Sequence, residues 1–248
     1  MIDKEYARDV LEDFLSFPLE SSVEILERFS SLPNAIYHND TEKRNFVYVP
    51  GNRQDRVLLI AHCDTVWDKE YFNCGTINQA IKCENGTYCG VKENFGIGAD
   101  DRAGCAILWL LKDSGHSLLI TDGEEYGRIG SFHIKEKYPE IFDELNKHSY
   151  MIQFDRRNSR DYKCYKIPVT NDFKSFIEKE LGFVDAGTTA FTDIVTLCNK
   201  ICGVNLSVGY YNEHSSSEAL VFDEWYHTLN IAEAMLSKKQ KAFLLQDT

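Results

Sequence analysis

The stretch Val57-Leu58-Leu59-Ile60-Ala61-His62-Cys63-Asp64 joins a continuous apolar run to a set of potential metal ligands. An uninterrupted apolar run of this length lacks the alternation of a half-buried strand. It therefore predicts a central strand that is covered on both faces. Residues 117–121, 150–154 and 204–208 are further predicted strands. The polar residues that follow these runs are expected at the ends of buried strands.

The segments between these strands carry the apolar spacing of helices. Helices are predicted over residues 4–31, 103–112, 129–137, 173–181, 192–199 and 216–238. Ser215 or Ser216 is the expected N-cap of the last helix. Residues 35–38 and 45–49 are predicted to be short strands, and residues 68–94 a long loop or a small hairpin. Because strands and helices alternate, we expect a single α/β domain over residues 1–248, with three layers and helices on both faces of a mostly parallel mixed sheet.

The composition limits the classes of partner. The formal net charge of −12 argues against binding to nucleic acid or to an anionic membrane surface. No apolar window has the length of a membrane span, and the N-terminus does not resemble a secretory signal. The eight cysteines are irregularly spaced, and Cys74, Cys83 and Cys89 lack the close pairing of a structural zinc site. We therefore expect reduced thiols and a cytoplasmic location.

Five short segments hold candidate metal ligands, each where a strand or helix is predicted to end. They are residues 61–66, 98–104, 122–127, 153–156 and 212–216. In an open α/β sheet, ligands gather at the carboxyl ends of the strands, so these segments are expected to meet at one edge. Imidazole nitrogen and carboxylate oxygen both bind zinc-type cations, and one carboxylate can bridge two ions. The pattern predicts a two-metal hydrolase.

Each segment alone also has an explanation without a metal. A buried histidine such as His62 is more often a hydrogen-bonded core residue, Asp100 and Asp101 could be a charged helix start, and Glu124-Glu125 is usually a solvated turn. Their occurrence together and in order favours the joint site. Four other histidines lack such a context and are expected at the surface or in structural contacts: His116, His133, His148 and His227.

In these motifs the chain resembles the co-catalytic di-zinc exopeptidases. This superfamily includes peptidase T, glutamate carboxypeptidases, aminoacylases and bacterial leucyl aminopeptidases. The resemblance spans nearly the whole chain. It rests, in order, on His62-Cys63-Asp64, Gly98-Ala99-Asp100-Asp101, Glu124-Glu125, Thr192-Asp193 and His214. It implies the phosphorylase/hydrolase-like fold of the zinc exopeptidases, hydrolysis of amide bonds, and two zinc ions that cobalt or manganese could replace.

The resemblance also implies a set of metal ligands. His62 and Asp155 would bind the first metal, and Glu125 and His214 would bind the second. Asp100 would bridge the two ions through its two oxygens.

Two further residues would act beside the metals. Asp64 would orient the ring of His62 and fix its tautomer. Glu124 would be the general base, taking a proton from the attacking water and giving it to the leaving amine.

Many relatives carry a separate lid domain between the equivalents of Asp155 and Thr192. Here a short stretch separates the two residues, which implies a bare catalytic domain of the leucyl aminopeptidase type. No clamp for a substrate carboxylate is evident, and Arg156 and Arg157 are expected to be solvated or ion-paired. An aminopeptidase for small peptides is the favoured function, and it could be oligomeric. The alternatives are a hydrolase of N-acyl amino acids or other small amides, and an inactive binding protein.

Overall fold

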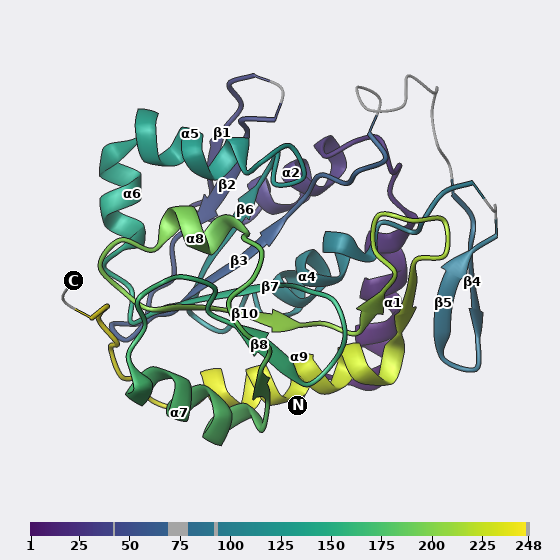
Figure 1. Cartoon of the computed structure of the whole chain (residues 1–248). Coiled ribbons are helices and arrows are strands. Elements are labelled where there is room, and N and C mark those ends of the chain that lie inside the picture. The colour runs from purple at the N-terminus through teal and green to yellow at the C-terminus, as the bar shows by residue number, and fades with distance from the viewer. Residues whose placement is uncertain (42, 69–78, 92–93, 247–248) are drawn as a thin grey trace.

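A mixed sheet forms the centre of the computed structural model, which describes residues 1–41, 43–68, 79–91 and 94–246 (Figure 1). Its strand order is β1-β2-β6-β3-β7-β10-β8-β9. The strands are β1 (Ile36–His38), β2 (Phe46–Val49), β3 (Leu58–His62), β6 (Ser117–Thr121), β7 (Met151–Arg156), β8 (Asp161–Lys163), β9 (Val184–Asp185) and β10 (Gly203–Ser207). The central four, β6, β3, β7 and β10, run parallel, whereas β2 and β8 are antiparallel to their inner neighbours. The predicted mostly parallel mixed sheet is confirmed.

Strand β3 lies between β6 and β7, and all five of its residues are buried. Leu58 pairs with Ser117 on one side and with Met151 on the other, so the three strands start level. Their carboxyl ends therefore reach the same edge of the sheet. This register places the polar residues that follow each strand next to one another.

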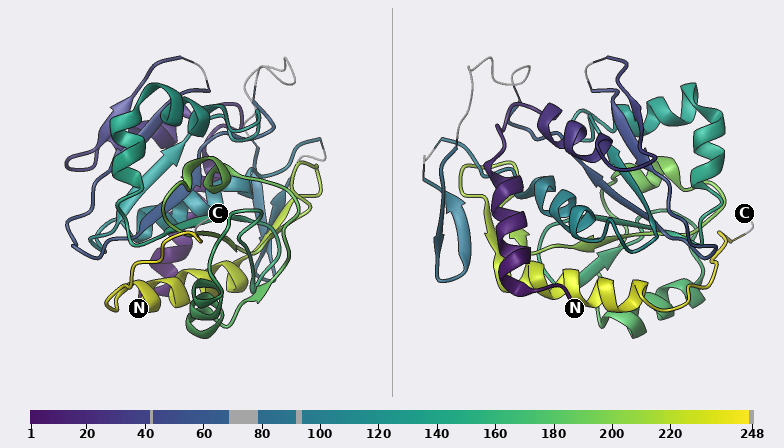
Figure 2. Two further views of the ribbon diagram at one scale, coloured as in Figure 1. Left: turned by 60° about the vertical axis from the view of Figure 1, so that its left-hand side comes forward. Right: turned by 180° about the vertical axis from the view of Figure 1, so that it is seen from behind.

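Helices cover both faces of the sheet (Figures 1 and 2). On one face, α4 (Ala99–Leu110) packs against β3 and β7, with α1 (Lys4–Ser16) and α9 (Phe222–Leu236) beside it. The other face carries α8 (Asp193–Leu197) against β7 and β10, followed outward by α5 (Ile129–Lys137) and α6 (Pro139–Leu145). At the ends, α2 (Val23–Ser30) contacts β1 and β2, and α7 (Asn171–Leu181) contacts α9. The three-layer prediction is thus confirmed.

A second, four-stranded sheet flanks the main one, in the order β11-β12-β5-β4. It consists of β4 (Ile81–Glu84), β5 (Thr87–Gly90), β11 (Tyr210–Tyr211) and β12 (Ala219–Val221). The hydroxyl of Tyr88 in β5 donates to Glu12 of α1 and accepts from Arg8, which fixes the β4–β5 hairpin against that helix. The predicted hairpin is confirmed over residues 81–90, while residues 69–78 and 92–93, with Cys74, lie outside the described residues.

The single helix predicted over residues 4–31 is wrong, because the chain forms two helices with a break at Pro18. A residue that precedes proline avoids the helical region, and Phe17 is extended, with φ −61° and ψ 150°. The carbonyls of Phe17 and Pro18 accept from the buried guanidinium of Arg102. Arg102 therefore does not pair with the acids beside it in the sequence.

The predicted final helix over residues 216–238 starts too early, and neither Ser215 nor Ser216 is its N-cap. The helix α9 begins at Phe222 after Val221. Residues 219–221 instead form β12, which pairs with β5. The carboxylate of Glu218 is buried and accepts three backbone N–H groups, which holds this segment away from a helical path.

The cysteines and three of the histidines agree with the expectations from the sequence. Every cysteine in the described residues is a free thiol. His116 and His148 are buried in hydrogen bonds with the backbone, and His133 pairs with Asp40, so these three are structural. None of the helices among the described residues has the length and apolar character needed to cross a membrane.

His148 should make stability depend on pH. Burial lowers its pKa from 6.5 to about 4, and its ring contacts the carbonyl of Leu145 and the hydroxyl of Ser117. Between these pH values the unfolded chain binds a proton that the folded chain does not. The free energy of unfolding is therefore expected to fall by about 3 kcal/mol as the pH decreases through this window.

Urea unfolding at pH 7 and pH 4.5, in a chelating buffer that removes metal effects, measures this dependence. The variant His148→Gln should show a difference between the two pH values that is smaller by roughly 2–3 kcal/mol. Asn199→Ala, at an exposed position without a titratable group, serves as the control and should keep the original difference. An unchanged difference in His148→Gln would show that other groups set the pH dependence.

Candidate metal centre

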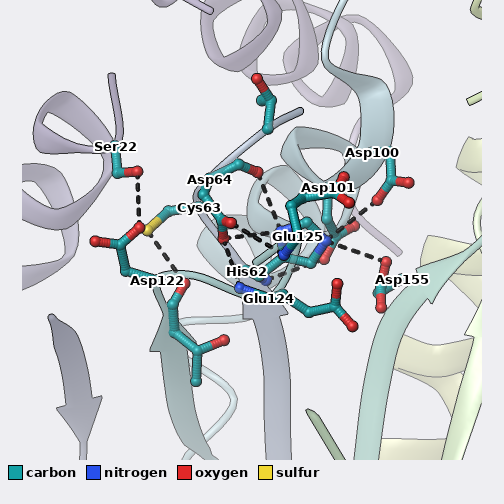
Figure 3. A network of polar contacts seen from close by, with 12 residues as sticks. Ser22, His62, Cys63, Asp64, Asp100, Asp101, Asp122, Glu124, Glu125 and Asp155 are labelled. Carbon is teal, nitrogen blue, oxygen red and sulfur yellow. Dashed lines mark hydrogen bonds and ion pairs between the residues drawn. The ribbon is translucent and has the colours of Figure 1, made fainter. Parts of the chain in front are cut away.

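The seven residues predicted for the site all lie at the carboxyl edge of the central strands, and Figure 3 shows the six that precede His214 in the sequence. They come from the end of β3, the start of α4, the turn after β6, the end of β7 and the loop after β11. In that order they are His62 with Asp64, Asp100, Glu124 with Glu125, Asp155, and His214. The side chains thus converge from five separate segments.

Asp100 lies between the two histidines. Its Oδ1 is 3.2 Å from Nε2 of His62, and its Oδ2 is 3.2 Å from Nε2 of His214. On the first side, Oδ1 of Asp155 is 3.3 Å from the same His62 nitrogen. On the second side, Oε1 of Glu125 is 2.9 Å from the same His214 nitrogen. The cluster therefore consists of two groups of ligand atoms that share one carboxylate.

Asp64 connects the end of β3 to the turn after β6. Its Oδ1 lies 3.3 Å from Nδ1 of His62, the ring nitrogen that faces away from Asp100. The same carboxylate accepts the backbone N–H groups of Glu124 and Glu125, each at 3.1 Å. One buried side chain thus orients the imidazole and fixes the backbone of both glutamates. Asp122, in the same turn, accepts instead from Ser22 and Asn45 and is directed away from the cluster (Figure 3).

Asp155 is held by residues from three elements. Its Oδ2 accepts from the hydroxyl of Thr192 at 2.6 Å and from Nε2 of Gln153 at 3.0 Å. Its backbone N–H and carbonyl both bond to the side chain of Asn205 in β10. The hydroxyl of Tyr210 lies 3.4 Å from Oδ1, the oxygen that faces His62. These contacts leave Oδ1 directed toward the shared cluster.

Glu218 supports the loop that carries Asp100, and the sequence analysis did not identify it. Its Oε2 accepts the N–H groups of Ile97 and Gly98, each at 2.8 Å, and its Oε1 accepts that of Asp100 at 3.0 Å. Gly98 has φ +64°, a conformation that favours glycine. The available signal is an acidic residue between a serine run and the apolar residues of β12, a segment whose sequence predicts a helix.

Asp101 lies within ligand distance of His62 and Asp155, so it is a further candidate donor. Both of its oxygens, however, already accept backbone N–H groups, Oδ2 from His62 and Oδ1 from Gly104. Burial raises its pKa well above the usual value. We therefore assign Asp101 to support of β3 and α4, and keep Asp100 as the shared carboxylate.

The cluster strongly attracts positive charge. Burial raises the pKa of Glu125 to about 7 and that of Asp155 to about 6, so both hold protons more tightly than usual. Hydrogen bonds to Asp100 and Glu125 raise the pKa of His214 to about 11. Divalent cations would compete with these protons for the same oxygen and nitrogen atoms. The donor set of carboxylates and imidazoles therefore fits a pair of zinc-type cations.

The cluster opens onto a cleft of about 250 Å³. The cleft is lined by Asp100, Glu124, Glu125, Asp155, Arg156, Arg157, Lys163, Tyr165, Ala190, Phe191, Thr192, Tyr210, Glu213 and His214. Burial and the nearby Asp155 raise the pKa of Glu124 well above its usual value. Arg156 and Arg157 are ion-paired with Asp161 and Glu213, as expected from the sequence. A small substrate in this cleft would contact both the cluster and Glu124.

Solved structures with a similar fold include aminopeptidases and a tripeptidase. Aminopeptidase PepT from Bacillus cereus ATCC 10987 is 14% identical, with a TM-score of 0.67, over 95% of this chain and 98% of that one. A tripeptidase from Staphylococcus aureus subsp. aureus Mu50 is 13% identical, with a TM-score of 0.69, over 96% and 98%. Aminopeptidase APDkam598 from the archaeon Desulfurococcus kamchatkensis is 12% identical, with a TM-score of 0.64, over 95% and 96%.

No family model and no curated protein matches the sequence. At these low identities the structural similarity establishes the fold, which this chain shares over nearly its whole length with the peptidases above. The fold expected from the resemblance is therefore confirmed.

Proposed function

We propose that this chain is a di-metal hydrolase that removes N-terminal residues from short peptides. The observation that carries the proposal is the shared carboxylate: Asp100 faces His62 with one oxygen and His214 with the other. Asp155 completes the first set of ligands and Glu125 the second. The shared fold of solved aminopeptidases supports the same conclusion.

The five ligand residues would hold two zinc ions, for which cobalt or manganese could substitute. Such ions would lower the pKa of a water and polarise the scissile carbonyl. Asp64 keeps the His62 ring in place through Nδ1, which leaves Nε2 for the metal. The register of β3 and β7 fixes His62 and Asp155 relative to each other. The protein thus supplies donors from β3 and β7 in a fixed register, and His214 of the exposed loop after β11 would complete the set.

Glu124 is the proposed general base. It lines the cleft beside the ligands, and its backbone N–H is fixed by Asp64. Its raised pKa suits a carboxylate that accepts a proton from water and then donates it to the leaving amine. A group with an ordinary carboxylate pKa would accept the proton from water less readily.

The free N-terminus of the substrate should be required. Glu124 adds a carboxylate to the cleft beyond the ligand set, which favours a cationic amine over a neutral acetamide. Short peptides and aminoacyl amides are therefore expected to be cleaved at least ~10-fold more efficiently than their N-acetylated forms, from the energy of one charged hydrogen bond. Comparing kcat/KM for each peptide with that for its acetylated form, in zinc-loaded protein, measures this preference.

The same comparison separates the alternative functions. Preferential hydrolysis of the acetylated set would contradict the aminopeptidase assignment and favour an N-acyl amino acid hydrolase. Metal binding with no hydrolysis of either set, across peptides of different side chains, would favour an inactive binding protein.

A further inference from the structure

Lys163 is a buried cation in the same cleft as the candidate metal centre. It is the last residue of β8, and only 8% of its surface is exposed. The cleft also holds five carboxylates and two arginines that are already ion-paired, and no clamp for a substrate carboxylate was evident from the sequence. A buried ammonium group in this position is unfavourable unless it binds a partner of opposite charge.

The charge of Lys163 has no acidic partner among the residues that the structure describes. Its Nζ donates to the carbonyl of Thr189 at 2.9 Å and to the hydroxyl of the same residue at 3.2 Å, and both acceptors are neutral. The two arginines of the cleft differ, since Arg156 pairs with Asp161 and Arg157 with Glu213. The Nζ of Lys163 also lies over the ring of Tyr165, 6.0 Å from its centre. An ammonium group has three N–H donors, so one donor remains for a ligand, and no carboxylate within the described residues pairs with the charge.

The surroundings make an anion favourable at this position. Burial, together with the positive charges of Arg156 and Arg157, lowers the pKa of the Lys163 ammonium. A carboxylate bound to the ammonium would offset both effects. Burying a charge without a partner is costly, and a substrate carboxylate would supply that partner.

The strand register gives the distance between Lys163 and the metal ligands. Lys163 pairs with Asn205 of β10, and Asn205 pairs with Gln153 of β7, two residues before Asp155. Neighbouring strands are about 4.8 Å apart, so the backbones of Lys163 and Gln153 are about 10 Å apart, and with the two further residues along β7 the backbones of Lys163 and Asp155 are about 12 Å apart. An extended peptide covers ~3.3–3.6 Å per residue, so about three residues span this distance. The cleft therefore suits a short peptide that reaches from the metals to Lys163.

We infer that Lys163 binds a carboxylate of the substrate, and that the free C-terminus of a short peptide is the group it selects. This inference rests on the proposed function, because it assigns the second end of the same substrate. The free amine would lie toward the metals and Glu124, and the carboxylate toward β8. The enzyme would then act on di- and tripeptides in preference to long chains.

Steady-state kinetics with a tripeptide of uncharged side chains, as the free acid and as the C-terminal amide, test this inference. In Lys163→Met, KM for the free acid should rise by ~10–100-fold, the usual effect of losing one charged hydrogen bond, with kcat little changed. The amide should be cleaved with the same KM by wild type and variant. Lys163→Arg should restore most of the preference for the acid, because it keeps the charge.

Lys179→Met, at an exposed position on α7, is the matched control and should leave both KM values unchanged. Thermal unfolding of each variant verifies the fold. An amidated tripeptide that carries glutamate at its last position distinguishes the two sources of a carboxylate. If KM depends on Lys163 for this peptide alone, Lys163 binds an acidic side chain, and the assignment to the C-terminus is overturned.

Equal effects of Lys163→Met on acid and amide, or no effect on either, would overturn the role of Lys163. If wild-type protein cleaves no peptide at all, the proposed function fails, and calorimetric binding of the free acid and the amide still decides this inference. Binding of the acid at least ~10-fold more tightly, with the difference lost in Lys163→Met, would support it. Equal binding of acid and amide would contradict it.

Discussion

Replacing Glu124 with glutamine is expected to reduce kcat by at least ~100-fold, the usual scale of general acid–base catalysis. The amide keeps the size of the side chain but cannot accept the proton from water. The backbone N–H of residue 124, which bonds to Asp64, is not affected by the substitution. Metal content should therefore stay at the wild-type level. Steady-state kinetics and elemental analysis of the same preparation measure the two effects separately.

Glu136→Gln, on the exposed surface of α5, is the matched control and should retain full turnover. Near-normal turnover in Glu124→Gln would show that another group accepts the proton. A loss of metal in this variant would show that Glu124 is a ligand, which would exchange its role with that of Glu125.

Removal of the metals is expected to abolish turnover, because the metals would both activate the attacking water and polarise the scissile carbonyl. Addition of zinc, cobalt or manganese to the chelated protein should restore it. A ligand that binds only the folded state at 100 times its Kd adds about 2.7 kcal/mol of stability. For a chain of this size, that corresponds to a rise in Tm of roughly 5–10 °C. Activity assays and calorimetry before and after dialysis against a chelator measure both quantities.

The variant Asp100→Asn should not recover when metals are added. Its side-chain amide lacks the charge of the carboxylate that faces both His62 and His214. In contrast, Asp113→Asn, at the exposed end of the turn after α4, should recover as wild type does. Turnover that persists after complete chelation in the wild-type protein would contradict a metal-dependent reaction.

The buried strands and most helices could be predicted because their local patterns agree with the tertiary structure. Residues 57–61 are apolar throughout because β3 is covered on both faces. The secondary-structure predictions were wrong where a contact with a distant part of the sequence determines the local backbone conformation. Glu218 is held by the backbone of residues 97–100, which lies more than a hundred positions earlier, and no local pattern reveals this contact. The break at Pro18, however, was visible in the sequence.

The candidate site could be proposed from the sequence because each ligand follows a strand or begins a helix. Strand ends of a parallel sheet share one edge, so local positions were enough to predict that the residues meet. The supporting residues could not be found in the same way. Asn205 and Lys163 lie inside strands, and their roles depend on the pairing of β10 with β7 and β8. That pairing is a property of the whole sheet.

The central claim is that two cations share the carboxylate of Asp100. The most direct test is a count of metal ions per chain in active protein, by elemental analysis during titration of the chelated protein with zinc. We predict that turnover reaches its maximum at two ions per chain. Full activity in protein that contains no transition metal, or a maximum at a single ion, would contradict the claim.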